Sequence, residues 1–126
     1  MKTAKVVLTS VLTMIGLSGR PVSAETTVVV NLGPHASATD AGYGEEDVDW
    51  LDVDRTDDTT CTQCFAALEL QRYLRKMTGR SHDFAITDDR QLPNGDAILV
   101  GGPESNAVSR ELAEDLGGTR RESSGL

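Results

Sequence analysis

The feature that most constrains the fold of this chain is the stretch from residue 65 to 79, whose sequence is FAALELQRYLRKMTG. Its apolar residues recur at the three- and four-residue spacing of one helix face: Ala66, Ala67, Leu70, Tyr73, Leu74 and Met77. Gly79 follows the last of them and can adopt the left-handed conformation that ends a helix. We therefore predict an amphipathic helix that begins near Thr60 or Thr62, either of which can cap it.

Short apolar runs surround this helix. Residues 26–32 are mostly β-branched and predict a buried strand, residues 84–86 predict a second strand, and Ala97–Val100, apolar throughout, predicts a central one. Residues 106–116 have helical spacing and predict a second helix that stops at Gly117. The resulting order, β-α-β-β-α, predicts a two-layer α/β fold with a small mixed sheet and two helices packed on one face.

The first 24 residues have the composition of a secretory signal peptide. Lys2 and Lys5 precede an apolar run at residues 6–17, which is too short to span a bilayer, and Val22-Ser23-Ala24 supplies the small residues that a signal peptidase requires. The alternative is an amino-terminal membrane anchor. We expect cleavage after Ala24, a secreted or periplasmic protein, and no membrane segment after cleavage.

The mature chain is small and strongly acidic. The net charge of −8 becomes −11 after cleavage, because Lys2, Lys5 and Arg20 are removed and no acid is lost. This balance argues against nucleic acid as a partner, since neutralising phosphates requires clustered basic residues. Residues 25–118 are expected to form one domain with a largely aliphatic core, and the polar residues 119–126 a disordered tail.

Acidic residues concentrate between positions 35 and 60, where Arg55 is the one basic residue. The segment lacks sustained periodicity, and we predict a long, exposed and partly disordered acidic loop. Closely spaced carboxylates can bind calcium, but the EF-hand pattern fails when counted from Asp52, because Asp57 and Gln63 occupy the positions of its glycine and glutamate. We therefore predict no metal ion and no other cofactor, and keep an acidic calcium- or surface-binding module as an alternative function.

Cys61 and Cys64 have the spacing of thiol–disulfide exchange proteins, in which helix amides stabilise a thiolate. In an oxidising compartment the same pair can form a structural or incidental disulfide. Haem attachment requires a histidine after the second cysteine, where this chain has Phe65. A small exported thiol redox protein is thus the main alternative function.

Two aromatic residues in the acidic segment, Tyr43 and Trp50, are candidates for contact with a sugar ring. For Trp50 we favour the alternative that the ring anchors the segment to the core. Hydrolysis of a glycosidic bond requires two carboxyl groups at a fixed separation across a cleft, and no such pair is evident in the sequence. We therefore assign no catalytic residues.

Two blocks of the sequence resemble the N-terminal domain that precedes the catalytic barrel of secreted alpha-glucuronidases, and related domains of beta-hexosaminidase-like glycoside hydrolases and bacterial exported proteins. The first block matches at Ala66, Ala67, Glu69, Leu70, Tyr73, Leu74, Met77, Thr78 and Gly79. The second matches at Ile98, Val100, Gly101, Pro103, Ser105 and Asn106. Together they cover roughly half of the mature chain, from residue 65 to 116.

The resemblance implies a non-catalytic accessory domain that supports carbohydrate breakdown. Its partners would be carbohydrate or the catalytic domain of a glycoside hydrolase, and the acids that cleave the sugar would lie in the absent barrel. The acidic segment is longer than the pattern requires, and the chain ends after the second helix, where further strands are expected. We therefore expect this sequence to represent a fragment of a longer protein.

The expected cleavage after Ala24 can be tested directly. Because the small residues of Val22-Ser23-Ala24 follow the apolar run, mass spectrometry of the exported protein should show Glu25 as its first residue. A soluble product that retains Met1 would contradict cleavage.

Overall fold

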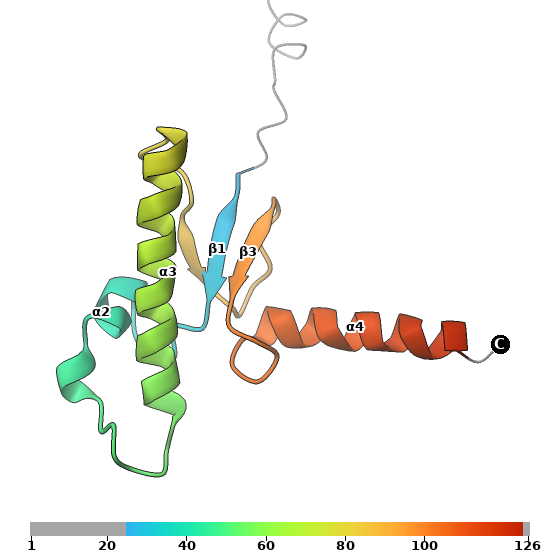
Figure 1. Cartoon of the computed structure of the whole chain (residues 1–126), viewed down its shortest axis with the longest axis horizontal. Helices are drawn as coiled ribbons and strands as arrows, with labels where there is room; N and C mark the ends of the chain where they lie inside the picture. The colour runs from blue at the N-terminus through green and yellow to red at the C-terminus, as the bar shows by residue number, and fades with distance from the viewer. Residues whose placement is uncertain (1–24, 125–126) are drawn as a thin grey trace, which may run out of the picture.

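The computed structural model describes the backbone of residues 25–124 and the side chains of residues 25–117, so the expected signal peptide lies outside it. It contains three strands, three α-helices and one 3-10 turn (Figure 1). In chain order these are β1 Thr27–Val30, α2 Ala38–Gly42, η1 Glu45–Asp47, α3 Thr56–Thr78, β2 Ile86–Asp88, β3 Ala97–Val100 and α4 Ala107–Ser124. The predicted small α/β fold is confirmed.

The three strands form one sheet in the order β2-β1-β3, and both pairings of β1 are parallel. The strand directions therefore differ from the mixed sheet expected from the sequence. The turn signal near Pro93 does not make a hairpin; instead, residues 89–96 carry the chain back to the amino ends of the strands. The central strand is β1, and Ala97–Val100 lies at an edge.

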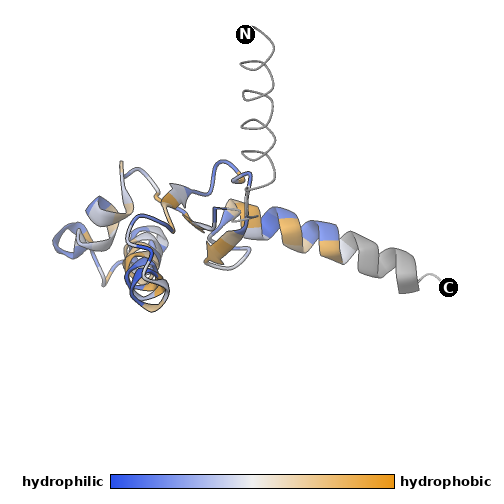
Figure 2. Cartoon of the chain, turned by 90° about the horizontal axis from the view of Figure 1, so that it is seen from above, coloured by the Kyte–Doolittle hydropathy of each residue, from blue (hydrophilic) through white to orange (hydrophobic). Residues whose placement is uncertain are grey.

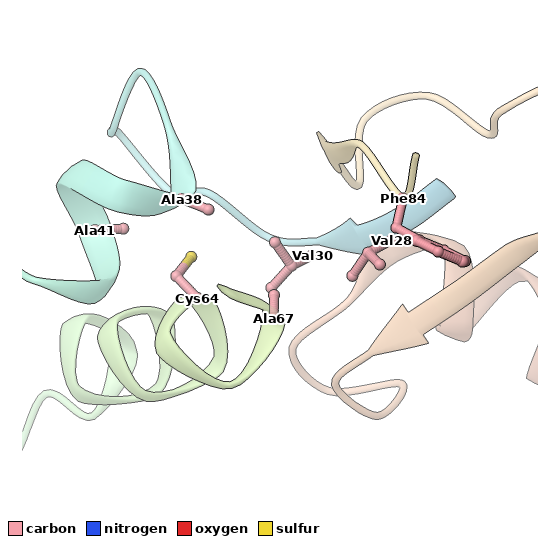
Figure 3. Packing of buried hydrophobic residues seen from close by; sticks show 7 residues of the cluster. All are labelled: Val28, Val30, Ala38, Ala41, Cys64, Ala67 and Phe84. Atoms are coloured by element: carbon pink, nitrogen blue, oxygen red, sulfur yellow. The ribbon is translucent and has the colours of Figure 1, made fainter. Parts of the chain in front are cut away.

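The core is built around β1. Val28, Val29 and Val30 have no exposed surface, so both faces of this strand are covered. Helix α3 lies across one face and contacts all three strands. The main cluster of buried apolar residues lies between α2, α3 and that face (Figure 3), and consists of Val28, Val30, Ala38, Ala41, Cys64, Ala67 and Phe84.

The buried face of α3 overlaps the predicted one only in part, since Ala67 is in the core cluster and Leu70 and Leu74 pack against it. Cys64 and Ala67 are fully buried, whereas Tyr73 is 53% exposed and Met77 is 80% exposed. Small residues occupy this face because α2 packs closely against it: a Cβ atom on Gly42 would lie 2.8 Å from the backbone nitrogen of Phe65. The carboxyl end of α3 is confirmed, since Gly79 has the expected left-handed conformation with φ of 70°.

The acidic segment 35–60 is more ordered than predicted. Residues 38–42 form α2, whose first turn is capped by Ser37, because the Ser37 side chain accepts a hydrogen bond from the Asp40 backbone nitrogen at 3.1 Å. Helix α3 begins at Thr56, one turn before the predicted start, and places Asp57 and Asp58 in its first turn, where carboxylates stabilise a helix. The exposed loop is thereby reduced to the residues between η1 and α3.

Helix α4 does not pack beside α3 on the sheet. It extends away from the strands (Figures 1 and 2), and beyond Ser109 its described side chains are all exposed. Val108 is buried, but Leu112 is 44% exposed and Leu116 is 72% exposed. The helix also continues past Gly117, where the sequence predicted its end, and its backbone extends to Ser124.

Asn106 joins the sheet to α4. Its fully buried side-chain nitrogen donates hydrogen bonds to the carbonyl oxygens of Val29 at 3.2 Å and Val100 at 3.0 Å. Its side-chain oxygen accepts a hydrogen bond from the backbone nitrogen of Ser109 at 3.1 Å and so caps the helix. Asp89 adds a second cap, because its carboxylate accepts the backbone N–H of Ala107 at 2.7 Å.

Substitutions of Asn106 test the connection between the sheet and α4. Asn106→Ala should lower the free energy of unfolding by about 2–4 kcal/mol, because it leaves buried carbonyl groups and the helix end without partners. Asn106→Asp keeps the capping oxygen but loses both donors, so it should destabilise at least as much. Urea denaturation measures both variants, with Asn94→Ala in the exposed turn as the control, expected to stay within about 0.5 kcal/mol of the wild type. A stable Asn106→Asp variant would show that only the cap matters.

Candidate functional site

The strand order creates a crevice at one edge of the sheet. From β1 the chain passes to β2 on one side and then to β3 on the other, so the connections diverge beyond the carboxyl ends of β1 and β3. In open parallel sheets ligands bind at such a switch point. A hollow of about 310 Å³ lies there, lined by Asn31, Arg55, Thr56, Thr59, Thr60, Gln63, Glu104 and Ser105.

Most of this lining consists of amide and hydroxyl groups, and the ends of the strands hold them in place. The Asn31 side chain follows β1, donates to the carbonyl oxygen of Ser105 at 3.1 Å and accepts from the backbone nitrogen of Gly33 at 2.7 Å. The Gln63 side-chain nitrogen donates to the Ser105 hydroxyl at 2.7 Å. These bonds connect the segments after β1 and β3 with the first turns of α3, so the crevice has a fixed polar wall.

Gly101 permits this arrangement. It has φ of 108°, a conformation that favours glycine, and a Cβ atom there would lie 2.7 Å from the Gln63 side-chain oxygen. That oxygen is buried and has no hydrogen-bond partner among the described residues. Gln63 therefore packs its side-chain oxygen against Gly101 while its side-chain nitrogen binds Ser105.

A second, more open hollow of about 580 Å³ adjoins the crevice and shares Arg55, Thr59 and Gln63 with it. Its other lining residues are Trp50, Asp58 and Thr62. The Trp50 ring is 45% exposed, and its indole nitrogen donates to the carbonyl oxygen of Glu45 at 3.3 Å. Trp50 thus lies at the rim of the site, outside the buried core cluster.

Tyr43, the other aromatic candidate, is not among the residues that line either hollow. It is 61% exposed and packs edge-on against Phe65, with ring centroids 5.8 Å apart and an interplanar angle of 88°. The structure therefore brings Trp50, but not Tyr43, to the hollow that adjoins the switch-point crevice.

Cys61 and Cys64 are both buried free thiols on the inner face of α3. They face different parts of the fold: the Cys61 sulfur lies 3.8 Å from the carbonyl oxygen of Gly42, and the Cys64 sulfur lies 3.4 Å from that of Asn31. In both cases the thiol is the donor and a backbone carbonyl is the acceptor.

These surroundings favour the protonated thiols. Burial, followed by the charge of Cys61 and that of Asp88, raises the pKa of Cys64 to about 11. Burial, followed by the charges of Glu45, Asp57 and Asp58, raises the pKa of Cys61. A cysteine that attacks disulfides needs a lowered pKa and access to its partner, so this geometry lends no support to a redox role.

The described acidic side chains lie apart from one another and from possible partner ligands. Within the side chains that the structure describes, no three His, Cys, Asp or Glu residues come together in a group that could hold an ion. The calcium alternative thus gains no support from the arrangement of Asp52, Asp54 and Asp57. Likewise, no helix within residues 25–124 combines the length and apolar character that crossing a bilayer requires.

No protein family, curated protein or solved structure matches this chain.

Asn31, Gln63 and Ser105 were not predicted to be site residues, and the sequence carries a signal for Asn31 and Ser105 but none for Gln63. Asn31 and Ser105 follow apolar strands, and the carboxyl ends of parallel strands meet at one edge of a sheet. Recognising them required knowing that β1 and β3 are parallel neighbours, which short strands do not reveal.

The raised pKa of Cys64 makes stability depend on pH. Because folding holds this thiol protonated up to about pH 11, whereas the ordinary value is 9.0, its contribution is complete below pH 9 and is lost as pH rises toward 11. Urea denaturation should show the wild-type free energy of unfolding falling more steeply between pH 9 and 11 than that of Cys64→Ala, whose baseline is lower. Identical slopes would contradict a raised pKa at Cys64.

Proposed function

We propose that this chain is a secreted, non-catalytic accessory domain that binds carbohydrate and supports its breakdown by a glycoside hydrolase. The observation that carries the proposal is the switch-point crevice, whose wall of amides and hydroxyls adjoins the exposed ring of Trp50. The resemblance of residues 65–116 to the domain that precedes alpha-glucuronidase barrels supports the same role.

The chemistry of the lining suits a sugar. Sugar hydroxyls donate and accept hydrogen bonds at once, and they match side chains that do the same, such as the hydroxyl groups of Thr59 and Ser105. The apolar face of a pyranose ring can stack on an aromatic ring such as Trp50. A site that recognises a small polar ligand typically has a small number of polar groups that point toward it, next to an aromatic surface.

The proposal assigns binding, and not bond cleavage, to this domain. In the families that the chain resembles, the two catalytic carboxyl groups lie in the barrel. The expected signal peptide places the domain outside the cytoplasm, where polysaccharides are encountered. The exposed Leu112 and Leu116 of α4 provide an apolar surface on which a catalytic domain can pack.

Affinity electrophoresis in gels that contain soluble polysaccharides tests the proposal. At least one polysaccharide should retard the purified protein, and Trp50→Ala should weaken that binding by about tenfold or more, equivalent to ~1.4 kcal/mol. Tyr43→Ala is the matched control: it removes an exposed aromatic ring that lines neither hollow, and should leave retardation unchanged. Absence of retardation by every polysaccharide, or equal losses in both variants, would refute the proposal.

A further inference from the structure

The turn that leads into β3 contains an asparagine whose side chain and following backbone amide are both free. Asn94 and Gly95 are exposed and lie between β2 and β3. Among the described residues, neither the Asn94 side chain nor the Gly95 backbone nitrogen makes a hydrogen bond. Asn94 also lines a hollow of about 370 Å³ that opens to solvent, so water reaches its side chain.

The other two asparagines of the chain differ from Asn94 in both respects. The Asn31 side chain makes two hydrogen bonds, and the backbone nitrogen of Leu32, which follows it, donates to a carboxylate at 3.1 Å. Asn106 is fully buried and bonded, and the backbone nitrogen of Ala107 donates to a second carboxylate at 2.7 Å. The fold therefore holds two asparagines in place and leaves the third unrestrained.

An unrestrained asparagine can react with the backbone of its own chain, a covalent change that alters charge and connectivity. The Gly95 nitrogen, once it has lost its proton, attacks the side-chain carbonyl carbon of Asn94. A carbon–nitrogen bond forms to the backbone, the bond to the side-chain nitrogen breaks, and ammonia leaves, which gives a cyclic imide. Water then opens the imide at one of its two carbonyl groups and yields either aspartate or isoaspartate, whose backbone runs through the former side chain.

Gly95 favours this reaction, and the packing of the fold requires glycine at this position. Without a side chain, Gly95 leaves its own nitrogen unshielded. A Cβ atom at residue 95 would collide with the carbonyl oxygen of Glu25. A bulkier residue, which would slow the attack, therefore cannot replace Gly95 unless the turn or the start of the described chain shifts.

We propose that Asn94 is a site of spontaneous deamidation, at which isoaspartate accumulates as the exported protein ages and loosens the pairing of β1 with β3. This modification does not depend on carbohydrate binding. The first hydrogen bond of that pairing runs from the Thr27 backbone nitrogen to the Asp96 carbonyl oxygen, at 2.8 Å, two residues after Asn94. Isoaspartate adds one methylene group to the backbone beside the close contact of Gly95 with Glu25, so the Asp96 carbonyl is displaced.

Peptide mapping by mass spectrometry tests the reaction on the full exported protein, incubated at mildly alkaline pH with and without urea. Without urea, Asn94 should lose ammonia at least about tenfold faster than Asn31 and Asn106, which must first be released by local unfolding. Labelling with an isoaspartyl methyltransferase should identify isoaspartate in the same peptide, and Asn94→Gln should abolish it.

Urea separates the contribution of the fold from that of the Asn-Gly sequence itself. Because no hydrogen bond holds Asn94 in the folded chain, its rate without urea should lie within about threefold of its rate in urea. A native rate more than about tenfold below the rate in urea would show that the turn protects Asn94 and would overturn the proposal. Absence of isoaspartate from the aged protein would overturn it as well.

Hydrogen exchange at the Thr27 amide tests the structural consequence. The amide should exchange at least about tenfold faster in aged, isoaspartate-containing protein than in freshly prepared Asn94→Asp, which has the same added charge without the longer backbone. Asn94→Gln, aged in parallel, should keep the exchange rate of the fresh wild type. Equal rates in the aged wild type and fresh Asn94→Asp would overturn the loosening of the sheet.

Discussion

The architecture depends on the side-chain amide of Asn106, which holds the carboxyl ends of β1 and β3 and the start of α4 in one hydrogen-bonded unit. The carbonyl groups of Val29 and Val100 lie at or next to the carboxyl ends of β1 and β3, so one amide connects two neighbouring strands near their ends. The segment before Asn106 is thereby fixed next to Asn31 and Gln63, which bond to Ser105. The positions of the crevice residues therefore depend on the hydrogen bonds of the buried Asn106 amide.

Helices α3 and α4 were largely predictable because their apolar spacing is long and regular, whereas the short α2 lies in the segment that was predicted to be a loop. The face of α3 was not, because the prediction weighted large residues, while close packing of α2 at Gly42 leaves room only for Cys64, Ala67 and similar small side chains. Tyr73 and Met77 are exposed as a result. The early start of α3 was missed because Arg55 offers no side-chain cap, and the first turn is stabilised by its own acids.

The sheet and the candidate site were less predictable for a related reason. Strands of three or four residues carry too little pattern to encode direction, so the parallel pairing of β1 with both neighbours is a property of the connections. The site is assembled from three segments that are far apart in sequence: the residue after β1, residues before and within α3, and residues after β3. Trp50 was singled out as an aromatic residue in a loop, but its neighbours Thr59 and Gln63 carried no signal of their own.

The position of β1 at the centre of the sheet constrains the order in which the chain can fold. Its partners are residues 86–88 and 97–100, and parallel strands cannot pair through a local hairpin. Helices α2 and α3 are close in sequence and contact each other, so they can associate early. Every strand pairing of the sheet, in contrast, requires residues that are distant in sequence. A chain released from its amino end, by a ribosome or a translocation channel, must therefore carry three unpaired valines until residue 88 has emerged, and one unpaired edge of β1 until residue 100 follows. The strand is open to chaperones throughout that interval.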